Sequence, residues 1–257
     1  MNNLDTLIKN GLVVTENEIG HLNIGIKDGK IAYLGDENLN AEFKINASDL
    51  IVLPGGIDPH VHVDQPSGDD VIMADNFQSA TKSAAAGGNT TILPFAMQIK
   101  GQSLRKCVED YHKKAQGNMY IDTSFHLIIS DPTPQVLGQE LPALSKDGYT
   151  SFKVFMTYDD LVLNDKELIE VFDVAKQLKT LVMVHAEGYD SIKYLSDKFE
   201  KEGKTAPYYH APTRPQIVER EATHRAISHA QIVDIPLMIV HVSGEEALNQ
   251  IRWAKDK

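Results

Sequence analysis

Four histidines and one lysine lie in apolar runs where their side chains could share metal ions. His60 and His62 lie together in GIDPHVHVDQ, while His185 and His241 end the apolar parts of VMVHAEG and MIVHVSG. Residues two apart on a strand point to the same side, so His60 and His62 could bind one ion together. One His-x-His pair is weak evidence for a metal site. Four histidines at equivalent positions of three runs favour one, because imidazole is a common metal ligand.

Lys153 is the fifth candidate, and it lies in the apolar run SFKVFMTY. Burying a charged ammonium is costly, so this setting should lower the lysine pKa and favour the neutral amine. A neutral amine can capture carbon dioxide as a carbamate, whose two oxygens can bridge two divalent ions. On its own, such a lysine would be expected to extend its ammonium from the strand end into solvent. With four histidines at the same edge, we interpret Lys153 as a bridging ligand.

Six strand-like runs alternate with amphipathic, helix-like stretches after Ile51. The runs are IVLPGGIDPHVH, NTTILPFA, DTSFHLIIS, SFKVFMTY, LVMVHAE and PLMIVHVS, and the helical stretches include 75–87, 102–115, 165–178 and 214–234. This alternation predicts βαβ units and a parallel sheet. The candidate ligands lie at or near the carboxyl ends of the strands, the edge at which α/β folds build active sites. Six strands are too few for a closed eight-stranded barrel and are compatible with an open, doubly wound sheet.

The first 52 residues have a different pattern of short strands. HLNIGIKDGKIAYLG alternates apolar and polar residues around Asp28-Gly29, which predicts a β-hairpin. We therefore predict a β-rich domain over 1–52 and an α/β domain over 53–257. In AAAGGNTT (84–91) the glycines lie between a helix and a strand, which predicts a helix stop rather than a phosphate-binding loop. The remaining histidines are interpreted as structural or surface residues: His21, His112, His126, His210, His224 and His229.

Composition excludes several classes of partner. The chain has 257 residues, 42% hydrophobic and 24% charged, with a net charge of −11. Nucleic-acid-binding proteins concentrate lysine and arginine, so the acidic balance argues against a nucleic-acid partner. No apolar stretch reaches the roughly 20 residues of a membrane helix, and the N-terminus lacks the apolar core of a signal peptide. The single cysteine, Cys107, excludes an internal disulfide and a cysteine-built metal site, and we predict a cytoplasmic location.

Five motifs together resemble the D-hydantoinase/dihydropyrimidinase branch of the amidohydrolase superfamily. They are PGGIDPHVH, SFKVFMTY, VHAEG, VEREATHRAI and IVHVSGEEAL, in this order, and the resemblance extends from about residue 5 to the last residue. It implies an α/β fold, a TIM (β/α)8 barrel of the metal-dependent hydrolase type, with about six of eight βα units present. It also implies a small β-sandwich built from both ends of the chain, with 1–52 as its N-terminal part, and a homo-oligomer, commonly a tetramer.

The same resemblance implies a binuclear centre and a reaction. His60, His62 and carboxylated Lys153 would hold one divalent ion, and Lys153, His185 and His241 would hold the second, with zinc the usual metal. Tyr158, five residues after the lysine, matches the family tyrosine that hydrogen-bonds the substrate carbonyl; outside this motif it would be interpreted as an interface tyrosine. The implied reaction opens a hydantoin or dihydropyrimidine ring to an N-carbamoyl amino acid, by attack of a bridging hydroxide on the ring amide.

Two departures from the family pattern affect these expectations. Ser67 lies where hydantoinases usually have an aromatic residue in the loop that covers the exocyclic group of the substrate. The last family ligand is an aspartate from the eighth strand, which also transfers the proton, and the predicted strands stop at the sixth. We therefore expect the chain to be truncated. Residues 1–257 alone are expected to be inactive toward cyclic amides, and either poorly soluble or oligomeric.

Three alternatives within the superfamily differ in what they require. An allantoinase-like cyclic amidohydrolase would use a similar centre. A dihydroorotase would be expected to have an arginine soon after the His-x-His pair, and HVDQPSG has none. A non-catalytic scaffold relative, of the kind found among the neuronal collapsin-response proteins, would have lost metal ligands, whereas every ligand that falls inside this chain is present.

Overall fold

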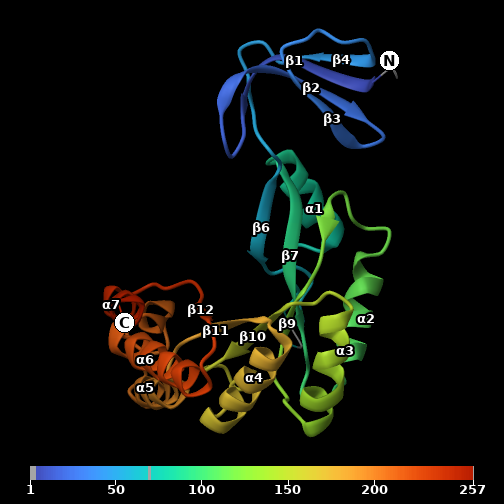
Figure 1. The fold of residues 1–257 in the computed structure, drawn as a ribbon. Helices are drawn as coiled ribbons and strands as arrows, with labels where there is room; N and C mark the ends of the chain where they lie inside the picture. Colours follow the sequence, from blue (N-terminus) through green and yellow to red (C-terminus); the bar gives the residue numbers. More distant parts are fainter. Residues whose placement is uncertain (1–3, 69–70, 257) are drawn as a thin grey trace. The chain divides into compact units, whose positions relative to one another are not determined.

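The computed structural model describes residues 4–68 and 71–256, and the chain divides into two compact units, residues 1–56 and 57–257 (Figure 1). The first unit is a mixed five-stranded sheet in the order β3-β2-β1-β4, with β5 also paired to β1. Its strands are β1 (Leu4–Val14), β2 (Ile19–Lys27), β3 (Lys30–Gly35), β4 (Ala41–Asn46) and β5 (Ile51–Val52). β1 pairs antiparallel with β2 and parallel with β4 and β5.

The predicted hairpin of the first unit is confirmed. β2 and β3 pair antiparallel on either side of Asp28 and Gly29, whose φ angles are +51° and +71°. Two successive residues in the left-handed region produce the tight turn that matches the twist of a two-stranded ribbon. Glycine adopts this conformation without steric cost, and aspartate tolerates it better than most residues do.

The second unit is a parallel sheet with helices, in the order β12-β11-β10-β9-β7-β6. Parallel pairing joins β7 to β9, β9 to β10, β10 to β11 and β11 to β12. The strands are β6 (Gly56–Val61), β7 (Asn89–Met97), β8 (Asp122–Thr123, paired with β7), β9 (His126–Ile128), β10 (Ser151–Phe155), β11 (Leu181–His185) and β12 (Leu237–Ile239).

Helices connect the successive strands of this unit. The α-helices are α1 (Phe77–Ala86), α2 (Leu104–Ala115), α3 (Leu141–Lys146), α4 (Asp165–Leu178), α5 (Tyr189–Lys201), α6 (Gln216–Val233) and α7 (Glu245–Lys255), with a π-helical turn η1 (Val136–Glu140) and a 3₁₀ turn η2 (Pro207–His210). The predicted helix stop is confirmed, since α1 ends at Ala86 and Gly88 has a φ of +89°. None of these helices, within the part of the chain that the structure describes, is long and apolar enough to cross a bilayer.

The two faces of the parallel sheet have different partners. One face packs against the helices in a large core, which includes Phe152 and Val154 of β10 together with Leu168 and Phe172 of α4. The other face has a smaller cluster that, among the described residues, comes from strands and strand ends only: Phe95, Ile128, Phe155, Met183 and Val240. A doubly wound sheet would have helices on both faces. The second unit is therefore part of a (β/α)8 barrel, and the doubly wound alternative is wrong.

The first predicted strand-like run, IVLPGGIDPHVH, divides into two elements. Its first residues form β5, which pairs with β1 in the first unit, whereas β6 begins at Gly56 and belongs to the barrel sheet. Leu53, Pro54 and Gly55 separate the two strands. The correction has a simple cause: a proline has no amide hydrogen to donate to a ladder, so strand pairing is interrupted there.

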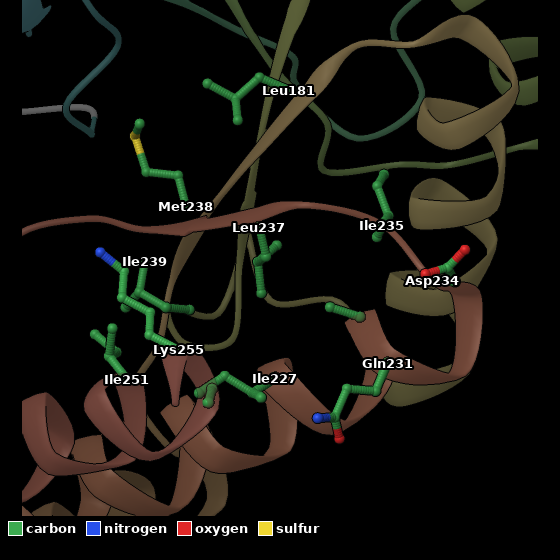
Figure 2. Close-up of a pocket in the computed structure, with 12 residues that line it drawn as sticks. Leu181, Ile227, Gln231, Asp234, Ile235, Leu237, Met238, Ile239, Ile251 and Lys255 are labelled. Atoms are coloured by element: carbon green, nitrogen blue, oxygen red, sulfur yellow. The ribbon is translucent and has the colours of Figure 1, made fainter. Parts of the chain in front are cut away.

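An apolar cavity of about 560 Å³ borders the edge strand β12 (Figure 2). Leu237 and Ile239 of β12 line it with Ile227 of α6 and Ile251 of α7. Among the described residues β12 pairs only with β11, so its other edge has no strand partner. None of the predicted site residues lines this cavity.

Candidate metal centre

The four candidate histidines meet at one edge of the barrel sheet. His60 is in β6, His62 follows that strand, His185 is the last residue of β11, and His241 lies two residues beyond β12. The ring centroids are 5.5 Å apart for His60 and His62, 5.6 Å for His60 and His241, and 4.4 Å for His185 and His241. A continuous series of imidazole contacts therefore joins three strand ends that are far apart in the sequence.

Lys153 lies among apolar side chains on the face of the sheet that has the smaller cluster, beside Phe95 and Phe155. The strand register places it beside Ile128 of β9 and Met183 of β11. Its side-chain nitrogen is 5.5 Å from the centre of the Phe95 ring and 5.0 Å from that of Phe155, and the residue is 1% exposed. No carboxylate pairs with it in the described part of the chain. Burial without a counter-charge lowers its pKa to about 7.

The surroundings also favour neutral imidazoles. Burial, followed by the charge of Lys153, lowers the pKa of His60 to about 4. Burial, followed by the charges of His185 and Lys153, does the same for His241. The pKa of His62 is lowered too, mainly by partial desolvation among its neighbours. A neutral imidazole has the free lone pair that a metal requires, so these three rings are in their ligand form at neutral pH.

Tyr158 lies three residues beyond β10 and lines a second cavity, separate from the apolar cavity beside β12. The cavity has a volume of about 390 Å³ and is lined by His62, Lys153, Tyr158, His185 and His241, among others. The ring centroids of Tyr158 and His185 are 5.1 Å apart. Burial, followed by the charge of Glu187, raises the Tyr158 pKa, so its hydroxyl stays protonated and able to donate a hydrogen bond. All the predicted site residues are thus brought together, although His60 does not line the cavity itself.

Three polar residues of this region were not singled out from the sequence. Gln65 contacts His62, with 2.7 Å between Oε1 and Nδ1. Glu187 contacts His185, with 2.6 Å between Oε2 and Nε2, and Arg214 donates to the same carboxylate oxygen at 2.9 Å. Burial raises the Glu187 pKa, but His185 and Arg214 more than offset this, and the pKa is lowered overall. Glu187 is two residues from His185 and Gln65 is three from His62, and this proximity is the only sequence signal for these two residues. Arg214, 27 residues from Glu187, has no such signal.

The donor set fits a pair of divalent ions when Lys153 is counted as a ligand. Within residues 4–68 and 71–256, no three His, Cys, Asp or Glu side chains are grouped as a metal site. Two histidines on each side of a buried lysine would not form such a group. Carboxylation would add an anionic, two-oxygen ligand beside two pairs of imidazoles, and zinc accepts both nitrogen and oxygen ligands at about 2 Å. The chemistry of these side chains is therefore compatible with the binuclear centre.

Comparisons with known proteins agree with the fold and the motifs. The model of the amidohydrolase family matches residues 51–242. A D-hydantoinase of Ralstonia pickettii is 46% identical over 99% of this chain and 55% of its own length, and a dihydropyrimidinase of Rattus norvegicus is 36% identical over 97% and 49%. A solved D-hydantoinase structure superimposes with a TM-score of 0.95 at 46% identity, covering 98% of this chain and 55% of that one. The chain thus spans about half the length of the relatives it matches.

Proposed function

The chain belongs to the amidohydrolase family, whose members are metal-dependent, and we propose that it contributes most of the metal centre of a cyclic amidohydrolase. The reaction is the hydrolytic opening of a hydantoin or dihydropyrimidine ring to an N-carbamoyl amino acid. Support for this substrate class comes from the relatives, which are D-hydantoinases and dihydropyrimidinases.

The observation on which the proposal depends is the environment of Lys153. A lysine with 1% exposure and no carboxylate partner among the described residues is a costly feature in a stable fold. Four imidazoles at the same sheet edge offer a chemical reason for a neutral lysine here, because a carbamate formed on it could bind metal ions together with them. In a purely structural role, the position would be better filled by an apolar side chain like those of its neighbours Ile128 and Met183.

Carboxylation of Lys153 follows from its neutral form. The nitrogen lone pair attacks the carbon of carbon dioxide, one C–O π pair moves to oxygen, and the nitrogen loses one proton to solvent. The product is a carbamate with one negative charge, so a buried neutral amine is replaced by a buried anion. In this proposal His60 and His62 would hold one ion together with the carbamate, and His185 and His241 would hold the other with the same carbamate.

The remaining residues have roles that their own chemistry allows. When bound, the two ions would supply Lewis acidity and a water nucleophile active near neutral pH. Phe95 stacks on His62 and contacts His60, with centroid distances of 4.8 Å and 4.7 Å, and so restricts both rings. Tyr158, with a protonated hydroxyl at the cavity rim, would donate a hydrogen bond to the carbonyl oxygen as negative charge develops there.

Metal analysis of a lysine variant tests the centre directly. Lys153→Ala should lose most of the bound metal, measured by elemental analysis of the purified intact protein, and a short carboxylic acid should restore part of it. Lys166→Ala is the matched control, because that side chain is 83% exposed on α4. Full metal content and activity in Lys153→Ala would refute the proposed ligand role.

A substrate panel tests the reaction class. Hydantoin, 5-phenylhydantoin, dihydrouracil and allantoin are offered to the intact, metal-loaded protein, and the N-carbamoyl product is quantified. Turnover of hydantoins or dihydrouracil supports the proposal, whereas turnover of allantoin alone favours the allantoinase-like alternative. Absence of both bound metal and turnover would favour a non-catalytic scaffold.

Several finer features belong to the same proposal and rest on the resemblance to the family. They are zinc as the resident metal, assembly as a homotetramer, a cytoplasmic location, and a composite β-sandwich to which residues 1–52 contribute. Elemental analysis, light scattering coupled to size exclusion, and cell fractionation test the first three.

A further inference from the structure

Gln65 fixes which nitrogen of His62 is free. Its side-chain amide donates from Nε2 to the carbonyl oxygen of Phe95 at 3.0 Å, while its Oε1 lies 2.7 Å from His62 Nδ1. A carbonyl oxygen only accepts, so the NH₂ group of Gln65 must face Phe95 and the amide oxygen must face the imidazole. His62 Nδ1 is therefore the donor. In the neutral ring, the lone pair is then on Nε2.

Glu187 fixes His185 through the opposite nitrogen. The contact of 2.6 Å joins His185 Nε2 to Glu187 Oε2, and Arg214 donates to the same oxygen at 2.9 Å. An ionised carboxylate only accepts, so His185 Nε2 has a proton, and in the neutral ring the lone pair is then on Nδ1. His185 Nδ1 makes no hydrogen bond within the described residues.

We propose that Gln65 and Glu187 are positioning residues that assign opposite ring nitrogens, Nε2 of His62 and Nδ1 of His185, to the metal centre. This inference rests on the proposed function. Ligating histidines commonly donate their second ring nitrogen to a carboxylate or carbonyl, which sets both the tautomer and the ring orientation. Here the neutral amide of Gln65, anchored to β7, sets the tautomer and orientation of His62. The carboxylate of Glu187, paired with Arg214, does the same for His185.

The surroundings of the two anchors explain why they stay in place. Gln65 is in the loop after β6, and this loop is also held by Lys114 of α2, which donates to the Asp64 carbonyl at 2.6 Å. Arg214 places its guanidinium carbon 5.7 Å from the centre of the Tyr158 ring while pairing with Glu187. Each anchor is therefore attached to a second element, and neither depends on the histidine for its position.

Nitrogen-15 NMR of histidine-labelled, metal-free protein at neutral pH measures the tautomers directly. We expect His62 to be protonated at Nδ1 and His185 at Nε2. Gln65→Met should convert His62 to a mixture of tautomers and leave His185 unchanged, and Glu187→Met should do the reverse. Gln65→Glu and Glu187→Gln keep an accepting oxygen, so each should preserve the original tautomer and show that the variant fold is intact.

Metal affinity, measured by competition with a chromophoric chelator for Zn²⁺, is the second readout. Gln65→Met and Glu187→Met should each weaken binding by about 10- to 100-fold, the usual effect of removing such a hydrogen-bond partner. Ser67→Ala is the matched control, because its hydroxyl donates to the Gln65 carbonyl at 3.2 Å but contacts neither ring. Its affinity and tautomers should match those of the unsubstituted protein.

The outcomes separate this inference from the proposed function. Unchanged tautomers in the methionine variants, or unchanged affinities in a protein that binds Zn²⁺, would overturn the inference and leave the function standing. The same holds if His62 is protonated at Nε2 in the unsubstituted protein. Absence of Zn²⁺ binding by the unsubstituted protein would instead overturn the proposed function, and the metal role of both anchors with it.

Discussion

Lys153→Met should stabilise the metal-free protein and remove a pH dependence that the lysine imposes. The native pKa of Lys153 is about 7, whereas an unfolded lysine titrates near its ordinary pKa of 10.5. That difference of roughly 3.5 pH units corresponds to about 5 kcal/mol, an order-of-magnitude cost of placing the ammonium among apolar side chains. The residue is 1% exposed, so solvent provides little screening. Methionine has a similar unbranched shape and has no charge to bury.

The sign of the pH effect follows from the lowered pKa. Between pH 7 and 10.5 the unfolded state binds the lysine proton and the folded state does not, so the free energy of unfolding rises with pH. Below pH 7 the lysine is protonated in both states and the full penalty applies. From pH 7 to pH 9 the gain is about 2 kcal/mol, from the same linkage relation. Lys153→Met should lack this gain.

Urea unfolding at pH 7, 8 and 9 measures the effect. The protein is treated with a chelator in carbon-dioxide-depleted buffer, so that neither metal nor carbamate contributes. The quantity of interest is the difference between variant and parent at each pH, because the titrations of Cys107 and Tyr111, both buried, affect the two proteins equally. Lys166→Met serves as an exposed control. Equal pH slopes for Lys153→Met and the parent would show that Lys153 is solvated, and would remove the basis for its neutral form.

Two further predictions concern catalysis and stability. Tyr158→Phe should lower kcat of the intact enzyme by more than tenfold with metal content unchanged, since one oxyanion donor is typically worth about 3 kcal/mol; an unchanged kcat would return Tyr158 to a structural role. Glu140→Gln should lower the free energy of unfolding by about 1–3 kcal/mol, because the 4%-exposed carboxylate accepts from the Leu104 amide at 2.6 Å at the start of α2. Burial raises the Glu140 pKa, but hydrogen bonds, led by that of Ser103, lower it overall below its ordinary value of 4.5. The carboxylate therefore adds to the free energy of unfolding above pH 4.5, and this contribution is lost as the pH falls through the native pKa. Urea unfolding at pH 7 and pH 4 tests this role of Glu140, with the exposed Glu109→Gln as the control. If Glu140→Gln and the parent lose the same stability on acidification, the role is refuted.

The sequence predicted the strand ends well, because a buried parallel strand has a strong local signature. Apolar runs of five to ten residues separated by helical stretches require little tertiary information. The polar residue that ends such a run is then placed at the carboxyl edge by topology alone, as happened for His185 at the end of β11. Lys153 could be identified for a similar reason, since a charge inside an apolar run is visible without a structure.

The anchors of the histidines could not be predicted in the same way. Gln65 reaches both His62 and the Phe95 carbonyl, 30 residues away, and Arg214 reaches Glu187, 27 residues away. Such contacts depend on the register of β6 against β7 and on how the loop before α6 places Arg214 beside Glu187. A local sequence pattern encodes neither of these features. The division between β5 and β6 was missed for a related reason, since only the pairing of Ile51 with Leu12 assigns β5 to the other sheet.

Two strained residues show how the scaffold determines the site. Tyr158 and His241 have φ angles of +73° and +38°, a region that costs a non-glycine residue about 1–3 kcal/mol. Tyr158 lies three residues after β10 and His241 two residues after β12, and both side chains line the cavity that contains Lys153.

The surrounding hydrogen bonds offset this cost. The Tyr158 carbonyl accepts from Leu161 and Val162 at 3.0 Å and 2.8 Å, and the loop after His241 is held by Glu219 of α6, which accepts from the amides of Ser243 and Gly244, both at 2.7 Å. Glu219 therefore links α6 to the position of His241, much as Gln65 links β7 to His62. The centre is built from rings whose positions are fixed by elements behind the strands, so exchanging the histidines alone would not reproduce it on another barrel.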